Sequence, residues 1–189
     1  APTDYRKTIL YNTFDVTSLL ASDNAIGVAL GNGHFYTTRQ NYKPYKIANF
    51  GYPKLRLNLI VEYTDGSRET IATDEKWKLT ADGPIRSNNE YDGEEYDARK
   101  ELGDWATVGY DDSAWQLAQR VSIPTGTLRG AMAPNMKVLQ TIKPLSIVKV
   151  GDKYIMDMGQ NMVGWIKMKV KGAENHTIIL RFAETLQKN

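Results

Sequence analysis

Hydrophobic and polar residues alternate with a period of two through much of the chain. Between residues 55 and 63, one face collects the apolar side chains Leu55, Leu57, Leu59, Val61 and Tyr63. This alternation is typical of a strand with one buried side. The following TDGSRET predicts a hairpin, because Asp65 and Gly66 suit the positive φ values of a tight turn. We expect residues 67–74 to return as the partner strand.

The same period recurs toward the end of the sequence. KPLSIVKVGDKYIMDMG (143–159) predicts two short strands joined at Gly151 and Asp152. WIKMKVKG (165–172) and HTIILRFAE (176–184) predict two more. The alternating lysines of the first of these segments indicate the solvent face of an outer strand.

Helical signals are sparse. One turn is expected in DVTSLL (15–20), capped by Asp15 or Thr17, and another in DDSAWQLAQ (111–119), capped by Asp112 or Ser113. Many short strands separated by turn residues predict an all-β, antiparallel β-sandwich. The turn-rich stretch TGTLRGAMAPNMK (125–137) lacks alternation, so we expect the chain to divide there.

Composition and charge narrow the classes of function. The 189 residues are 41% hydrophobic, and 24 basic residues face 22 acidic ones. Because no Lys/Arg block is present, a nucleic-acid partner is not expected. No stretch approaches the ~18 apolar residues of a membrane span, so membrane insertion is not expected either. The absence of cysteine excludes thiolate chemistry, and the two histidines, His34 and His176, lie far apart in the sequence.

The segment NEYDGEEYDARKE (89–101) concentrates six carboxylates: Glu90, Asp92, Glu94, Glu95, Asp97 and Glu101. Like charges this close repel one another unless a cation or an arginine lies among them. We expect Asp97 and Arg99 to form an ion pair or capping bonds. The stretch SNNEYDGEE (87–95) offers oxygens of the kind that calcium prefers, without the spacing of an EF-hand. Turn formation by Asn, Asp and Gly is the competing interpretation.

Acid–base catalysis is a third interpretation of the same segment. Inverting glycosidases need two carboxyls about 6.5–9.5 Å apart across a sugar cleft. The spacing of Asp92 with Glu94 or Glu95 permits such a pair.

Aromatic residues suggest where a sugar ring could stack. The loop QNYKPYKIANFGYPK (40–54) carries Tyr42, Tyr45, Phe50 and Tyr52, and long loops on sandwiches often line binding sites. His34 follows a glycine turn and is a candidate for the same cleft. Trp77 and Trp115 are predicted to pack inside instead.

Four segments together resemble one family. These are FDVTSLLASDNAIGVALGNG (14–33), YDGEEYDARKE (91–101), GDWATVGYDDSAWQLA (103–118) and DMGQNMVGW (157–165). In this order they are similar to the amino-terminal β-domains of bacterial α-L-rhamnosidases.

The resemblance implies a fold and a function. Residues 1–128 would form a jelly-roll, galactose-binding-like accessory domain, and residues 129–189 would begin a second β-sandwich domain. It places the inverting hydrolysis of terminal α-L-rhamnosyl linkages in an (α/α)6 barrel downstream, so no catalytic residue is expected here. The implied partners are a rhamnose-containing glycan or glycoside and the catalytic domain of the same polypeptide. The implied location is periplasmic or secreted, and a structural spacer without sugar affinity is the alternative.

The resemblance also implies a site. Some family members bind L-rhamnose through calcium held by protein oxygens. The matching metal candidates are Asn32, Asn88 and Asp92. The full set of expected sugar-binding residues is Asn32, His34, Tyr42, Tyr45, Asn88, Asn89, Asp92 and Glu94.

Overall fold

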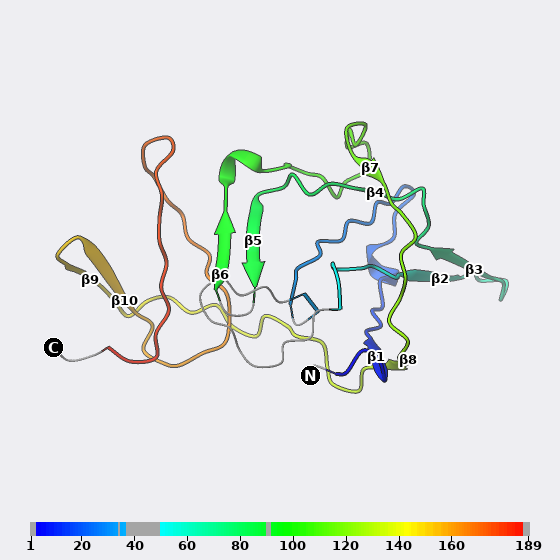
Figure 1. The fold of residues 1–189 in the computed structure, drawn as a ribbon, viewed down its shortest axis with the longest axis horizontal. Coiled ribbons are helices and arrows are strands. Elements are labelled where there is room, and N and C mark those ends of the chain that lie inside the picture. Colours follow the sequence, from blue (N-terminus) through cyan, green and yellow to red (C-terminus); the bar gives the residue numbers. More distant parts are fainter. Residues whose placement is uncertain (1–2, 34, 37–49, 90–91, 187–189) are drawn as a thin grey trace. The chain divides into compact units, whose positions relative to one another are not determined.

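The computed structural model describes residues 3–33, 35–36, 50–89 and 92–186. These residues form ten short strands and two three-residue 3-10 turns (Figure 1). The strands pair two by two, and four of the five ladders in the described residues are antiparallel. The predicted all-β, antiparallel sandwich class is confirmed. Jelly-roll connectivity stays a prediction.

The first predicted hairpin is present. β2 (Asn58–Glu62) pairs with β3 (Arg68–Ala72), and Gly66 adopts a φ of 85° in the turn. The Asp65 carboxylate accepts hydrogen bonds from both the backbone N–H and the hydroxyl of Ser67. Alternate residues of β2 are half-buried, as the period of two predicts.

Two further antiparallel ladders are formed by strands within and on either side of the acidic segment in the sequence. β5 (Ile85–Asn89) pairs with β6 (Gly93–Tyr96), and β4 (Lys78–Leu79) pairs with β7 (Gln116–Leu117). The helical turn predicted over residues 111–119 is wrong. The Asp111 carboxylate accepts from the Ser113 N–H and closes a turn there, and the chain then enters β7.

The first strand of the chain forms a parallel ladder with a strand near residue 130. β1 (Thr8–Tyr11) runs beside β8 (Thr127–Gly130), with Thr8 opposite Thr127. Gly126 precedes β8 and lies against the backbone carbonyl of Tyr5, to which its N–H donates at 3.1 Å. A side chain at this position would collide with that carbonyl, so the close approach requires glycine.

Two single 3-10 turns interrupt the strands. η1 (Thr17–Leu19) falls where a helical turn is predicted, and the Asp15 carboxylate accepts from the Thr17 N–H at 3.0 Å. η2 (Ala98–Lys100) follows the acidic strand, and Asp97 caps it through the Arg99 N–H.

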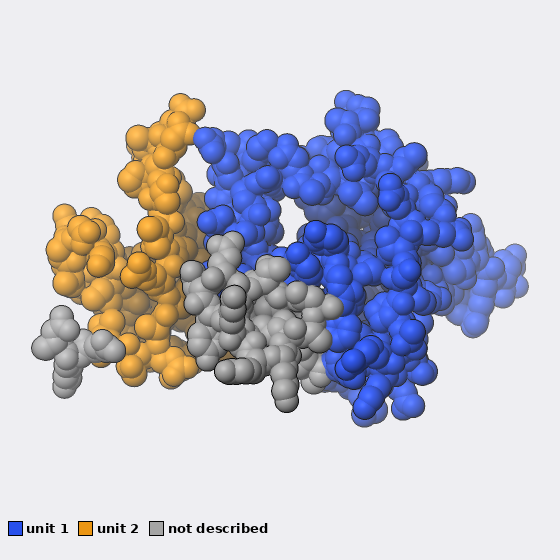
Figure 2. Space-filling model, in the orientation of Figure 1, with its two compact units in different colours: residues 1–134 blue, residues 135–189 orange. Residues whose placement is uncertain are grey.

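The contacts divide the chain into two compact units, residues 1–134 (unit 1) and 135–189 (unit 2) (Figure 2). The domain limits predicted at residues 128 and 129 stay a prediction. Unit 2 contains the hairpin of β9 (Ser146–Val150) and β10 (Lys153–Asp157) around Gly151, as expected.

The two strands predicted for residues 165–172 and 176–184 are absent from the described part of unit 2. The chain does reverse between them, where the His176 N–H donates to the Ala173 carbonyl. The hydrophobic members of these segments remain exposed, with Trp165 at 79% and Phe182 at 79%. An alternating pattern produces a strand only where a partner backbone and a layer to bury against are both present.

Aromatic contacts mark the packed part of unit 1. Trp105 and Trp115 lie 6.2 Å apart between ring centroids, and Tyr110 contacts Trp115 edge-on at 5.7 Å. Gly27 fits directly against the Trp105 ring. Trp77 and Trp115, predicted to pack inside, are half-buried, and no hydrophobic side chain among the described residues is fully buried.

Candidate functional site

The glycine turn that follows the first 30 residues is tied to the β5–β6 hairpin by a pair of asparagines. The backbone N–H of Asn32 donates to the Asn88 side-chain oxygen at 3.2 Å, and the Asn32 amide donates to the Asn88 carbonyl at 2.7 Å. Both residues are half-buried. Because the two bonds join backbone and side chain reciprocally, they fix the turn against the strand across 56 positions of sequence.

The register of the hairpin places a carboxylate beside this pair. Asn88 lies directly opposite Glu94, and residues opposite each other in a ladder share one face of it. Glu95 is the next residue along β6, so it belongs to the other face. Asn88 and Glu94 are therefore on one face, and Asn32 is bonded to the first of them.

Asn89 and Asp92 form a separate contact at the hairpin turn. The Asp92 N–H donates to the Asn89 side-chain oxygen at 2.7 Å, and the Asn89 amide donates to the Asp92 carboxylate at 3.1 Å. Gly93 completes the turn with a φ of 84°. This geometry is what turn formation by Asn, Asp and Gly requires.

The predicted residues thus fall into three groups. Asn32 is hydrogen bonded to Asn88, Glu94 lies opposite Asn88 in the ladder, and Asn89 joins Asp92. His34, Tyr42 and Tyr45 lie outside the described residues. The sugar-binding and metal roles assigned to all eight stay predictions.

Tyr36, which is absent from the predicted residues, lies one turn from Asn32 and contacts Tyr52, one of the loop aromatics expected to stack on a sugar ring. The Tyr36 N–H donates to the Asn32 carbonyl at 3.1 Å, and the Tyr36 ring lies 5.0 Å from the Tyr52 ring. The neighbouring Tyr52 phenol raises the pKa of Tyr36, because two phenolates this close would repel each other. Tyr52 is 74% exposed, so its ring is open to a ligand. The aromatic residues Phe35 and Tyr36, which follow the GNG turn closely, could have indicated this position from the sequence.

An ion pair between Asp97 and Arg99 accounts for part of the acidic segment. The Arg99 guanidinium donates to both Asp97 carboxylate oxygens, at 2.8 and 2.7 Å, which confirms the expected pairing. These hydrogen bonds lower the pKa of Asp97 to about 2. Lys100 reaches Asp82 instead, with 2.9 Å between Nζ and the carboxylate. Asp97 is therefore committed to a structural pair with Arg99.

The side-chain oxygens of the candidate metal ligands in the described residues do not form a calcium site by themselves. Calcium takes six to eight oxygens. The Asn88 side-chain oxygen and one Asp92 oxygen each already accept an intramolecular hydrogen bond. No group of three or more His, Asp or Glu side chains that could hold a metal occurs in the part of the chain that the structure describes. Calcium binding stays a prediction.

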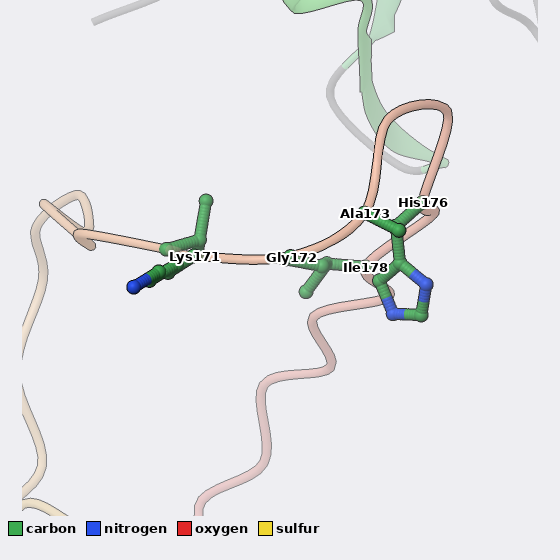
Figure 3. Close-up of a pocket in the computed structure, with 6 residues that line it drawn as sticks. Lys171, Gly172, Ala173, His176 and Ile178 are labelled. Carbon is green, nitrogen blue, oxygen red and sulfur yellow. The ribbon is translucent and has the colours of Figure 1, made fainter.

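Unit 2 carries an open hollow of about 570 Å³ at the chain reversal near His176 (Figure 3). The imidazole of His176 lies beside Ile178, and the Lys171 side chain extends away from both (Figure 3). Because the lysine and the histidine do not converge, this surface offers no polar constellation for a ligand. The candidate site is therefore the Asn32–Asn88–Glu94 group in unit 1.

No helix in the described part of the chain is long and apolar enough to cross a membrane.

Comparison with known proteins gives consistent relatives. Residues 1–140 match the α-L-rhamnosidase N-terminal domain, and residues 148–189 match the bacterial α-L-rhamnosidase concanavalin-like domain. An α-L-rhamnosidase of Formosa agariphila is 37% identical over 100% of this chain and 20% of its own length. An α-L-rhamnosidase of Streptomyces avermitilis is 35% identical over 97% of this chain and 18% of its own length.

Solved structures agree with these relatives. An α-L-rhamnosidase structure from Dictyoglumus thermophilum matches with a TM-score of 0.65 and 34% identity, over 84% of this chain and 17% of that one. The Streptomyces avermitilis α-L-rhamnosidase complexed with L-rhamnose matches with a TM-score of 0.64 and 27% identity, over 85% of this chain and 16% of that one. The chain spans 20% or less of the length of these relatives. Because one family model covers residues 1–140 of the 189, the chain belongs to the α-L-rhamnosidase N-terminal domain family.

Proposed function

We propose that this chain is a non-catalytic accessory region of an α-L-rhamnosidase, with a jelly-roll domain that binds L-rhamnosyl units. The parent enzyme would hydrolyse terminal α-L-rhamnosyl linkages in a rhamnose-containing glycan or glycoside outside the bacterial cytoplasm. This region would hold substrate or position the catalytic barrel.

One observation carries the proposal. The Asn32–Asn88 bonds bring a glycine turn, an exposed carboxylate and an aromatic pair into the same neighbourhood. Sugar sites combine such elements, because carboxylate and amide oxygens accept from vicinal hydroxyls and an aromatic ring packs on the apolar side of a pyranose. Glu94 is exposed and free of the turn geometry that occupies Asp92.

Two adjacent glutamates provide a matched test. Titration of the chain with L-rhamnose, followed by NMR chemical shifts, should give saturable binding. Glu94→Gln should weaken it by about 1.5 kcal/mol, roughly tenfold, because a charge-assisted hydrogen bond is lost. Glu95→Gln should leave the affinity unchanged, since Glu95 lies on the other face of β6.

The possible outcomes separate the hypotheses. Wild-type spectra that do not respond to L-rhamnose would support a structural spacer instead. Equal losses in the two glutamine variants would show that the Asn88 face is not the site. The same titration is repeated with a calcium chelator. Because the candidate ligand oxygens in the described residues do not form a calcium site by themselves, we expect the chelator to leave the affinity for L-rhamnose unchanged. Loss of binding would show that the site depends on calcium.

A further inference from the structure

Unit 1 carries a hollow of its own, and its lining differs in chemistry from the candidate rhamnose site. It has a volume of about 390 Å³, within the range of roughly 300–1,000 Å³ typical of ligand pockets. Two cationic side chains, an aromatic ring and two hydroxyls line it: Arg6, Lys54, Phe50, Ser122 and Thr125. It brings the start of unit 1 together with residues 50–54 and the segment before β8.

Lys54 is a positioned cation with no carboxylate partner within ion-pair distance among the described residues. Its Nζ donates to the carbonyls of Phe50 at 3.3 Å and Tyr52 at 3.2 Å, and it lies 5.0 Å from the centre of the Phe35 ring. The residue is half-buried, so its charge is partly removed from water. An ammonium has three donors, which leaves one for a ligand.

Arg6 adds donors without changing the charge balance. Its Nε and Nη2 donate to the two Asp4 oxygens at 2.9 and 3.0 Å. A guanidinium has five N–H donors, so the remaining ones stay available after this bidentate pairing. Because Asp4 neutralises Arg6, the hollow carries one net positive charge, which belongs to Lys54.

The non-ionic lining suits a sugar ring. Phe50 packs edge-on against Tyr5 at 4.9 Å and lies 5.6 Å from Phe35, so its ring is held in place while it lines the hollow. The Ser122 and Thr125 hydroxyls can both donate and accept. The Thr125 hydroxyl donates to the Arg6 carbonyl at 3.4 Å, a long bond that leaves its oxygen able to accept.

We propose that this hollow binds an acidic saccharide unit, with the Lys54 ammonium pairing with its carboxylate and the Phe50 ring packing against its pyranose face. One carboxylate matches the one net positive charge. The proposal rests on the proposed function in expecting a glycan ligand, and it extends the recognised glycan to one that carries uronic acid beside rhamnose.

The test titrates the full chain with D-glucuronate, with D-glucose and with inorganic sulfate, at constant ionic strength. Glucuronate should bind, glucose should bind at least tenfold more weakly, and sulfate should bind more weakly than glucuronate because it gains nothing from Phe50. Lys54→Gln should weaken glucuronate binding about tenfold or more. Lys7→Gln removes the same charge beside Arg6 without touching the hollow, and it should have little effect.

Several results would overturn the proposal. Glucuronate and sulfate binding equally well would mean a simple anion site, and no glucuronate binding would mean no site. Equal effects of Lys54→Gln and Lys7→Gln would mean unspecific attraction. Glu94→Gln should leave glucuronate binding intact, because Glu94 does not line the hollow. Loss of the glucuronate site can therefore be distinguished from loss of the rhamnose site.

Discussion

Asp97 shows how one side chain can serve two purposes in this chain. Its carboxylate accepts from the Arg99 backbone N–H, which caps η2, and from the Arg99 guanidinium. The same contacts lower its pKa from 3.8 to about 2. A carboxyl whose pKa is lower in the folded chain stabilises the fold above its unfolded pKa and loses that contribution as the pH falls.

The charge of Asp97 can be tested separately from its cap. Asp97→Asn keeps a side-chain oxygen that can accept from the Arg99 N–H but removes the ion pair. At neutral pH the variant should unfold at lower denaturant concentration than the wild type. The difference should shrink as the pH falls from about 3.8 to about 2, where the wild-type carboxyl takes up its proton. Urea titrations across that range measure it, and a difference independent of pH would contradict the pairing.

Gly27 illustrates a purely steric requirement at the same scale. A Cβ there would lie 2.5 Å from Trp105 Cζ3 and 2.6 Å from the Ala106 Cβ. Gly27→Ala should therefore lower the free energy of unfolding by about 1–3 kcal/mol, since the indole must shift. Gly83→Ala is the control, because its Cβ would meet only Leu102 at 3.6 Å. Equal thermal midpoints for the two variants would show that the Trp105 contact is not rigid.

Sequence reasoning at the residue scale succeeded where the contact is local. Asp97 and Arg99 are two positions apart, so a turn brings them together whatever the rest of the chain does. The Asn32–Asn88 bonds join residues 56 positions apart, and spacing carries no information about such a contact. Only the family resemblance placed both residues in one candidate site.

At the scale of elements, a single turn residue controls the β2–β3 hairpin. Gly66 has a φ of 85°, a conformation that L-residues avoid. Gly66→Ala should lower the free energy of unfolding by roughly 1–2 kcal/mol. Gly66→Asn should cost less, because asparagine tolerates positive φ. Thermal unfolding followed by circular dichroism gives the order, and an asparagine variant as weak as the alanine one would contradict this account.

The failures at this scale share a physical cause. Residues 111–119 carry helix-capping residues, but the Asp111 turn and the ladder with β4 determine the outcome. Residues 165–184 carry a clear period of two, yet the described chain gives them no ladder. A sequence pattern states a local preference, whereas pairing depends on which backbone is available. The hairpins at Gly66 and Gly151 were predictable because each strand finds its partner through a short turn.

At the scale of the whole molecule, the proposed division of labour makes a simple prediction. The chain alone should release no nitrophenol from p-nitrophenyl α-L-rhamnoside. The Asp92 carboxylate is hydrogen bonded to Asn89 in the hairpin turn, Asp97 is occupied by Arg99, and Glu94 and Glu95 lie on opposite faces of β6. The proposal therefore assigns catalysis to none of these carboxylates. The Dictyoglumus thermophilum enzyme serves as the positive control. Turnover that survives repeated purification would contradict a non-catalytic role.

The distribution of tryptophan gives the two units different optical behaviour. Trp77, Trp105 and Trp115 are half-buried in unit 1, whereas Trp165 in unit 2 is 79% exposed. Exposed indole already emits as it does in water, so its spectrum changes little when the chain loses structure. The red shift of intrinsic fluorescence during denaturation therefore follows the melting of residues 1–134 almost alone, without any added label.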